Sequence, residues 1–584
     1  MNIIYIKVTE LWLIAKRLAS FCSIYFIALH GLKAESTVSE QMPGDALIFF
    51  ESEKISDFLV KVRDSDFFQS LLESGDLDEI KSSDFMKEVS STFEFLELFL
   101  AKDIWTLNER LLNGKMGLGA YESEDPDDPN VVLLIKPEET SKWIKNRIRF
   151  APLLRLGIKR IAKSDFEKEV YAFRTRGDKN DSTYFALSDE WIIVTTSRRL
   201  LKDTVSLQGS KVEGAKIINP ISKDDKYNNM IKNMGDGHQA SLYLNTQEIS
   251  KIDGRFGIPE KIEDPMLSLF LGGVIDQLSV SSYSGLTLSF DGEELNFSVQ
   301  VDTAKETVAL NQNSPIDIIL PPKIPGYLGG ISVYQPFSNW YSERNDLFKS
   351  KIIPGSDLIK GKLGQLLFGG AKESDSGYLG KSIVFLSAIA DDAGKDDNEI
   401  NLPGFCFLVD LKKVEGVEKT MQTFFEEMLL ELKVSDLEDP LEWEKSTEQV
   451  QDINLLVAST KKLQEGIAPT PNCFQIGSRF CFSSSYKLSL SLIEKIKNSE
   501  LPSSESGLNF DLDFNQLTKF FSLNKEEYLA ELSRSRGDKK SGERDYKNIN
   551  TFLSGLKSIS GSYDSSEDKL KFNLEARLKK QDKN

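Results

Sequence analysis

The sequence has little of what most catalytic and metal sites use. Its 584 residues include two histidines and four cysteines. Histidine is the usual general base and zinc ligand near neutral pH, and the cysteine thiolate is a common nucleophile. The patterns HExxH, CxxC and GxSxG do not occur. We therefore expect a protein that is not an enzyme and that has no catalytic, metal-binding or cofactor-binding residues.

Basic residues are also in deficit. Lys and Arg number 72 against 90 Asp and Glu, which gives a formal net charge of −18. A chain this acidic does not hold nucleic acid or anionic lipid by electrostatic attraction. Hydrophobic residues make up 40% of the chain and charged residues 28%. That balance is sufficient for a large core, and it excludes a disordered tail or a collagen-like fibre.

Long apolar runs are absent after the N-terminal segment. Within residues 1–34, Lys7, Lys16 and Arg17 form a basic region, and LASFCSIYFIAL (18–29) is an apolar run. A small residue, Ala34, ends the segment. This arrangement predicts a secretory signal peptide over 1–34. We expect the mature chain to be exported, periplasmic or extracellular, and not membrane-spanning.

Two other interpretations of residues 1–34 stay open. The segment is a retained anchor if cleavage does not occur, although the apolar run has 12 residues where a spanning helix needs about 17–25. A lipoprotein site at Cys22 is disfavoured because the bulky Phe21 precedes it, where a small residue is needed.

The sequence after residue 34 contains a weak internal duplication. Six segments of the first half resemble segments of the second half, in the same order and at offsets of 266–289 residues. The pairs are ALIFFES (46–52) with LGGISVY (328–334), MGLGAYE (116–122) with SIVFLSA (382–388), VVLLIKPEETSKWIK (131–145) with FCFLVDLKKVEGVEK (405–419), STYFALSDEWIIVTTSRRLL (182–201) with PNCFQIGSRFCFSSSYKLSL (471–490), ASLYLNTQEISKI (240–252) with LNFDLDFNQLTKF (508–520), and LNFSVQVD (295–302) with LKFNLEAR (570–577). We predict a first α+β repeat at 35–310 and a second at 311–584, joined by a proline-containing linker at 311–326.

Hydrophobic periodicity predicts the elements of each repeat. Helical spacing is present at 85–100, and helices are expected at 139–161 and 414–432. Alternating apolar residues around a short polar turn predict hairpins at 184–194 and 473–483, and Asp291-Gly292 marks a later one. Strands joined by hairpins give mainly antiparallel sheets, so the predicted class is α+β, with helices on one face of each sheet.

This order of elements, repeated behind a signal peptide, resembles a domain-of-unknown-function family of large exported bacterial proteins. Members of that family often carry Asp-Pro after the strand that opens the long helix, where this chain has Lys136-Pro137 and Asp410-Leu411. The resemblance implies the fold, the two repeats and the exported compartment. It implies no catalytic residue.

A few residues need to be weighed as sites. His238 lies in a polar loop, where a lone histidine is usually solvated. The acidic loops 124–130 and 391–399 offer carboxylates to Ca²⁺ or to acid/base catalysis, but they lack EF-hand spacing and are typical of solvated hairpin tips. The tripeptide Arg-Gly-Asp occurs at 176–178 and 536–538, where Gly-Asp is ordinary turn chemistry.

Three cysteines lie outside the predicted signal peptide: Cys406, Cys473 and Cys481. They allow three single pairings, and the sequence does not select one. A two-residue turn at Gly477-Ser478 would divide the apolar side chains of the hairpin between two faces. Two three-residue loops keep them on one face: a loop at 476–478 sets Cys473 directly across from Cys481, and a loop at 477–479 leaves Cys473 diagonal to it. The corresponding first-half loop, 188–190, is wholly polar and favours the loop at 477–479. We therefore predict that loop, with Cys473 and Cys481 on the same face, diagonal to each other and not bonded.

These observations give one leading hypothesis and two alternatives. The leading one is a non-enzymatic binding or scaffold protein of the bacterial cell envelope, whose partner or ligand is unknown. The first alternative is a carboxylate-dependent hydrolase that acts on an envelope polymer. The second is a calcium-dependent adhesin that uses the acidic loops or the Arg-Gly-Asp turns.

Overall fold

The computed structural model describes about half of the chain. The described residues are 37–53, 114–123, 130–136, 159–160, 171–174, 184–187, 191–209, 212, 218–234, 238–253, 281–290, 294–302, 318–334, 361, 364, 377–389, 403–412, 415–431, 442–460, 470–499, 501–566 and 569–579. They divide into two compact units, which we call the first unit (within 37–302) and the second unit (within 318–579).

The first unit contains an antiparallel sheet in the order β4-β5-β6-β7-β3-β2-β1-β8-β9-β10. Its strands are β1 (Ile48–Glu53), β2 (Lys115–Tyr121), β3 (Asn130–Lys136), β4 (Lys159–Arg160), β5 (Tyr171–Arg174), β6 (Tyr184–Leu187), β7 (Ile192–Thr195), β8 (Ala240–Leu244), β9 (Ser284–Phe290) and β10 (Glu294–Asp302). Its helices are η1 (Val38–Glu40), α8 (Arg198–Leu207), η4 (Ile221–Lys223), α9 (Asp225–Met234) and α10 (Thr246–Asp253).

The second unit contains an antiparallel sheet in the order β15-β16-β17-β18-β14-β13-β12-β20-β21-β22. Its strands are β12 (Tyr327–Tyr334), β13 (Leu379–Ile389), β14 (Pro403–Leu411), β15 (Glu444–Val450), β16 (Ile453–Ser459), β17 (Asn472–Ile476), β18 (Arg479–Ser483), β20 (Leu508–Asp513), β21 (Leu556–Ser566) and β22 (Lys569–Leu578), and β11 (Ile318–Ile319) pairs separately with β19 (Ser503–Ser504). Its helices are α16 (Val417–Glu431), α17 (Tyr486–Asn498), α18 (Phe514–Leu523), α19 (Lys525–Arg536) and α20 (Lys539–Gly555).

These elements confirm the predicted α+β class. The predicted helix at 414–432 is α16, and the predicted hairpins are β6–β7, β17–β18 and β9–β10. The predicted helix at 139–161 is wrong at its end, because Lys159 and Arg160 form β4 and pair with β5. The rest of that helix, and the one at 85–100, lie outside the described residues.

The sheet of the first unit is buried on both faces: Phe50, Ile135 and Val194 are buried on one face, and a core cluster lies on the other. Side chains of η1, α8, η4 and α9 pack there against β1, β3 and β7. The buried members are Val38, Met42, Ala46, Phe49, Tyr121, Val132, Leu134, Ala186, Trp191, Ile193, Leu200, Leu201, Val205, Ile221, Tyr227, Met230, Met234, Tyr243 and Tyr283. Gly117 of β2 allows this close packing, since a Cβ there would lie 2.2 Å from Val38 Cγ1.

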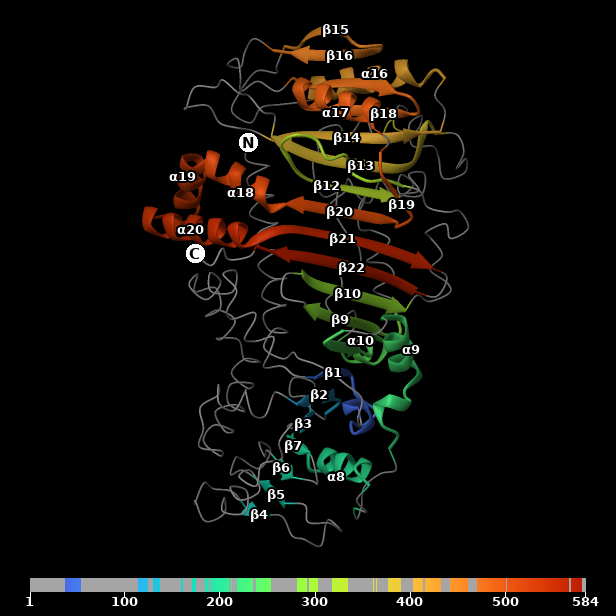
Figure 1. Cartoon of the computed structure of the whole chain (residues 1–584), viewed down its shortest axis with the longest axis vertical. Helices are drawn as coiled ribbons and strands as arrows, with labels where there is room; N and C mark the ends of the chain where they lie inside the picture. Colours follow the sequence, from blue (N-terminus) through green and yellow to red (C-terminus); the bar gives the residue numbers. More distant parts are fainter. Residues whose placement is uncertain are drawn as a thin grey trace. The chain divides into compact units, whose positions relative to one another are not determined.

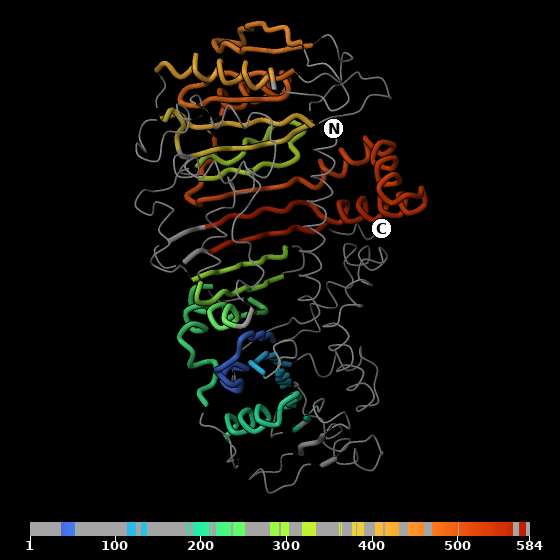
Figure 2. The backbone as a smooth tube through the Cα atoms, turned by 180° about the vertical axis from the view of Figure 1, so that it is seen from behind, coloured from blue at the N-terminus to red at the C-terminus, as the bar shows by residue number. Residues whose placement is uncertain are grey.

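The second unit has helices on both faces of its sheet, so the prediction of one covered face is wrong there. Leu488 and Leu492 of α17 pack on one face, with Leu408 and Phe474. On the opposite face, Phe482 of β18 contacts aromatic rings of α16 at centroid distances of 5.8 and 6.4 Å. Figure 1 shows α17 in front of these strands, and Figure 2 shows α16 from behind. Because both faces are covered, the strands between these helices are apolar on both sides.

The two covered faces also overturn the predicted hairpin register. The turn between β17 and β18 has two residues, and Gly477 in it has φ +58°. Phe474 therefore lies opposite Cys481, and Cys473 opposite Phe482. Cys473 and Cys481 consequently point to opposite faces. Dividing the apolar side chains costs nothing here, because α17 buries one set and α16 the other.

Between β20 and β21 the second unit carries three consecutive helices, α18, α19 and α20. They lie beyond one end of these two strands in both views (Figures 1 and 2). Phe521 of α18 stacks on Tyr546 of α20 at 4.6 Å and approaches Tyr528 of α19 at 4.4 Å. These aromatic contacts pack the helices against one another. We call residues 514–555 the helical arm.

Candidate functional site

A polar junction joins the sheet of the first unit to α8. Ser197 precedes the helix, and its Oγ accepts a hydrogen bond from Leu200 N (3.4 Å), which satisfies a free backbone donor of the first turn. Ser197 N donates to Thr195 Oγ1 at 3.1 Å. Val131 N of β3 donates to Thr196 Oγ1 at 2.9 Å. The junction therefore fixes where α8 begins relative to β3 and β7.

The second unit contains the same junction at the start of α17. Ser485 Oγ accepts from Leu488 N (3.4 Å), and Ser485 N donates to Ser483 Oγ (3.2 Å). Phe405 N of β14 donates to Ser484 Oγ at 2.9 Å. In both units the hydroxyls of three successive Ser or Thr residues accept these backbone hydrogen bonds, so the short Ser/Thr runs have a structural role.

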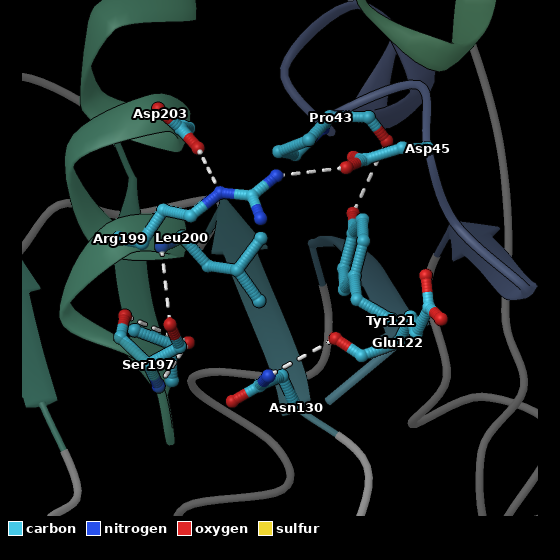
Figure 3. Close-up of polar contacts among 10 residues, drawn as sticks. Pro43, Asp45, Tyr121, Glu122, Asn130, Ser197, Arg199, Leu200 and Asp203 are labelled. Atoms are coloured by element: carbon cyan, nitrogen blue, oxygen red, sulfur yellow. Dashed lines mark hydrogen bonds and ion pairs between the residues drawn. The ribbon is translucent and has the colours of Figure 1, made fainter. Parts of the chain in front are cut away.

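Beside the junction of the first unit lies a charged cluster centred on Arg199 (Figure 3). Its Nη2 lies 3.0 Å from Asp45 Oδ2, in the loop before β1, and its Nε lies 3.4 Å from Asp203 Oδ2, one turn along α8. Asp203 is 1% exposed, whereas Arg199 and Asp45 are 52% and 51% exposed. The guanidinium thus joins a buried carboxylate to an exposed one and ties the loop to the helix.

Tyr121 completes this cluster from the end of β2. Its hydroxyl donates to the carbonyl oxygen of Pro43 at 3.2 Å (Figure 3). Burial raises the pKa of Tyr121 well above its usual value, and the negative charges of Asp45 and Asp203 raise that pKa further. Tyr121 therefore stays protonated at neutral pH and acts as a hydrogen-bond donor.

The cluster is suited to holding the chain together rather than to acid/base catalysis. Asp203 is the one buried acidic residue among those the structure describes, and it is paired with Arg199. A glycosidase-type site needs two carboxyl groups that face each other across the substrate, whereas Asp203 and Asp45 are both paired with Arg199. The corresponding positions beside α17 carry Lys487 and Ser491, so this cluster belongs to the first unit.

A second polar group of the first unit contains the half-buried Glu51 and the buried Tyr227. The Tyr227 hydroxyl donates to Glu51 Oε1, and Ser241 Oγ lies 3.5 Å from the same oxygen. Burial raises the pKa of Tyr227 well above its usual value, and Glu51 raises it further. The tyrosine is therefore a protonated donor, and edge-on rings of Phe49 and Tyr243 lie 5.6 and 5.8 Å from it.

The second unit has a third polar group near β20. Asp511 forms an ion pair with Lys323, and it accepts a hydrogen bond from the Tyr327 hydroxyl at 2.6 Å. Lys323 Nζ lies 4.2 Å from the centre of the Tyr327 ring. Burial lowers the pKa of Lys323 and raises that of Tyr327. These contacts hold the 321–327 segment on the sheet.

Most candidate residues from the sequence lie outside the part of the chain that the structure describes. His238 lies two residues before β8 and interacts with another residue of the chain. The described part of the chain contains no group of side chains that could hold a metal ion. The acidic residues 124–129 and 391–399 and the tripeptide 176–178 lie outside the described residues. Of these candidates, the structure therefore places only His238.

The tripeptide at 536–538 connects α19 to α20, and each of its residues has a structural role. Arg536 Nε pairs with Asp545 Oδ2 at 2.6 Å. Gly537 has φ +78°, the left-handed conformation that ends α19. Asp538 caps α20 by accepting from Ser541 N at 2.8 Å, and the hydrogen bonds from Ser541 lower the pKa of Asp538. This is the ordinary turn chemistry that the sequence predicts.

Sequence reasoning missed the Arg199 cluster and the helical arm. Arg199 and Asp203 have the i,i+4 spacing of a helical ion pair, which was a usable signal. Asp45 lies 154 residues away from Arg199, and no local pattern connects them.

Among the helices that the structure describes, none has the length and apolar character to cross a membrane. No family model matches the chain, and no curated protein matches it. Solved structures of TP0453 are similar at 8% identity. For crystal form I the TM-score is 0.23, and the match covers 49% of this chain and 82% of TP0453. For form IV the TM-score is 0.24, with 48% of this chain and 87% of TP0453 covered. For form III the TM-score is 0.24, with 48% of this chain and 82% of TP0453 covered. At these scores the likeness carries no argument about function.

Proposed function

We propose that this chain is a non-enzymatic binding or scaffold protein of the bacterial cell envelope, exported behind the signal peptide at 1–34 and built from two repeats. In this proposal the junctions, ion pairs and buried tyrosines stabilise the fold. The partner or ligand binds to surface elements that do not contribute to that stability. The resemblance to exported bacterial proteins of unknown function is part of the same proposal.

The repeat proposal is supported by strand order and by register. Numbered along the chain within each unit, the ten strands of the two sheets have the same spatial order, 4-5-6-7-3-2-1-8-9-10 in the first unit and its counterpart in the second. One row of opposed residues in the first unit is Glu51, Gly117, Leu134, Ile193 and Ala186. The row Ser332, Val384, Leu408, Cys481 and Phe474 lies 281, 267, 274, 288 and 288 residues further on. Each offset differs by at most one from that of the similar sequence segments.

The observation that carries the binding proposal is the helical arm. Antiparallel neighbours such as β20 and β21 need only a two- to five-residue turn, about a tenth of the arm's length. The middle helix, α19, buries none of its residues, and Leu523, the last residue of α18, is 50% exposed. Within the arm, α18 packs on the sheet and buries Phe514, whereas α19 buries no residue. An exposed helix held in place by its neighbours is the kind of feature on which folds place recognition.

A photo-crosslinking experiment tests binding by the arm. A photoreactive residue replaces Leu523 in the full chain, and a matched variant carries it at Leu430 of α16, which is 75% exposed. We expect a discrete adduct in envelope extract from position 523 only. Equal labelling at both positions, or none at 523, would contradict the assignment to the arm.

Export is tested separately by fractionating cells and sequencing the N-terminus of the native protein. We expect a mature N-terminus close to residue 35 in the periplasmic or extracellular fraction. Recovery of the chain from the cytosol with Met1 intact would refute export without affecting the crosslinking result.

A further inference from the structure

Two of the described cysteines are in contact inside the second unit. Cys406 Sγ of β14 lies 3.2 Å from Cys481 Sγ of β18. Both side chains are fully buried, and they lie on the face covered by α17, together with Leu408, Phe474 and Leu488. We propose that Cys406 and Cys481 are the pair that joins as a disulfide when the chain is oxidised.

The sheet register selects this pair over the alternatives. Opposed residues point to the same face, and successive residues point to opposite faces. Cys481 is opposite Leu408 and Phe474, and Cys406 is two residues before Leu408, so both thiols lie on one face. Cys473 is opposite Phe482 and points to the other face. The backbone of β17 and β18 therefore separates Cys473 from the other two thiols.

The diagonal placement does not prevent the bond. Diagonal neighbours have Cα atoms roughly 7–8 Å apart, slightly more than most disulfides span. The two sulfur atoms are nevertheless close enough for an S–H···S contact, because the side chains lean toward each other. Closing from this contact to a covalent bond requires a shift of about one ångström, which side-chain rotation and small strand movements provide.

The chemistry requires an external oxidant of the disulfide class, such as oxidised glutathione or an envelope thiol oxidase. One thiolate attacks a sulfur of that disulfide and releases one thiol. The second thiolate then attacks the mixed disulfide, so that the Sγ–Sγ bond forms and a second thiol leaves. Two protons and two electrons pass to the oxidant.

The buried position determines when this reaction occurs. Burial raises the pKa of the Cys481 thiol well above its usual value, and its contact with Cys406 adds to the effect. In the folded core Cys481 is therefore a protonated thiol, which does not react with a disulfide. We expect exchange while the chain folds, before α17 covers the sheet. Once formed, the bond links strands 75 residues apart in sequence and resists reductants until the unit unfolds.

Mass spectrometry of the purified full chain tests the pairing. The chain is refolded in oxidised and reduced glutathione, alkylated without reduction and digested with trypsin. Cleavage after Lys and Arg places the three described cysteines on separate peptides, 396–412, 463–479 and 480–487, and Cys22 on a fourth, 18–33. We expect 396–412 linked to 480–487, with Cys473 alkylated. Any crosslink through Cys473, or full alkylation of all three thiols, would overturn the proposal.

Three variants provide a second readout. A reductant should lower the denaturant midpoint of the oxidised wild type and of Cys473→Ala alike, since Cys473 is equally buried but unpaired in the proposal. The reductant should have no effect on Cys406→Ala or Cys481→Ala. A reductant-dependent shift that persists in Cys406→Ala would contradict the pairing. Because the buffer is defined, the result does not depend on whether the protein is exported or what it binds.

Discussion

The two-sided burial of the β17–β18 hairpin makes a sharp prediction about Phe474 and Phe480. Phe474 is 2% exposed under α17, and Phe480 is 1% exposed on the opposite face. Truncation of a buried Phe to Ala costs about 3–5 kcal/mol through lost burial and the cavity left behind. We expect each single variant, Phe474→Ala and Phe480→Ala, to lower the free energy of unfolding by that amount.

The double variant tests the register itself. With a two-residue turn, the sheet backbone separates the two rings, so their effects should add to within about 0.5 kcal/mol. With a three-residue loop, Phe474 and Phe480 would be neighbours on one face, and their effects would couple by about 1–3 kcal/mol.

Urea unfolding followed by circular dichroism measures all three variants. Phe405→Ala is the matched control: this ring is 40% exposed in the neighbouring strand, and its removal should cost less than about 1 kcal/mol. A coupling energy above about 1 kcal/mol between Phe474 and Phe480 would refute the register and the division of the hairpin between two helices.

Three further predictions concern the turns, caps and ion pairs. Gly326→Ala should lower the free energy of unfolding by about 3 kcal/mol or more, because φ is +72° and a Cβ would lie 2.1 Å from Ile389 O. Gly477 has φ +58° but open space around it, so Gly477→Ala should lower the free energy of unfolding by about 1–2 kcal/mol in the same urea titration. Asp538→Ala should lower the melting temperature at pH 7. Because the pKa of Asp538 is lowered in the folded state, that difference should be present above the ordinary carboxyl pKa near ~4 and should vanish in calorimetric scans as the pH falls through the lower folded value. In urea unfolding, Asp203→Ala should lower the free energy of unfolding by about 1–3 kcal/mol and Asp45→Ala by less than about 0.5 kcal/mol, because only Asp203 is the buried member of an ion pair. Equal losses in the two variants would contradict this expectation.

The sequence by itself determined what depends on local spacing. Two short apolar runs at 184–187 and 192–195, separated by a polar turn, are sufficient to specify a hairpin. The 3.6-residue period near 417–431 is sufficient to specify α16. The α+β class follows from these signals alone.

Only the tertiary structure decided which side each residue faces and what it meets there. An apolar alternation does not say whether one face of a strand is covered or two, so the register of β17 and β18 depended on α16 and α17 packing on opposite sides. The contact of Cys406 with Cys481 and that of Arg199 with Asp45 join residues 75 and 154 positions apart. Such contacts arise when strands take their places in a sheet, and no local pattern in the sequence encodes that order.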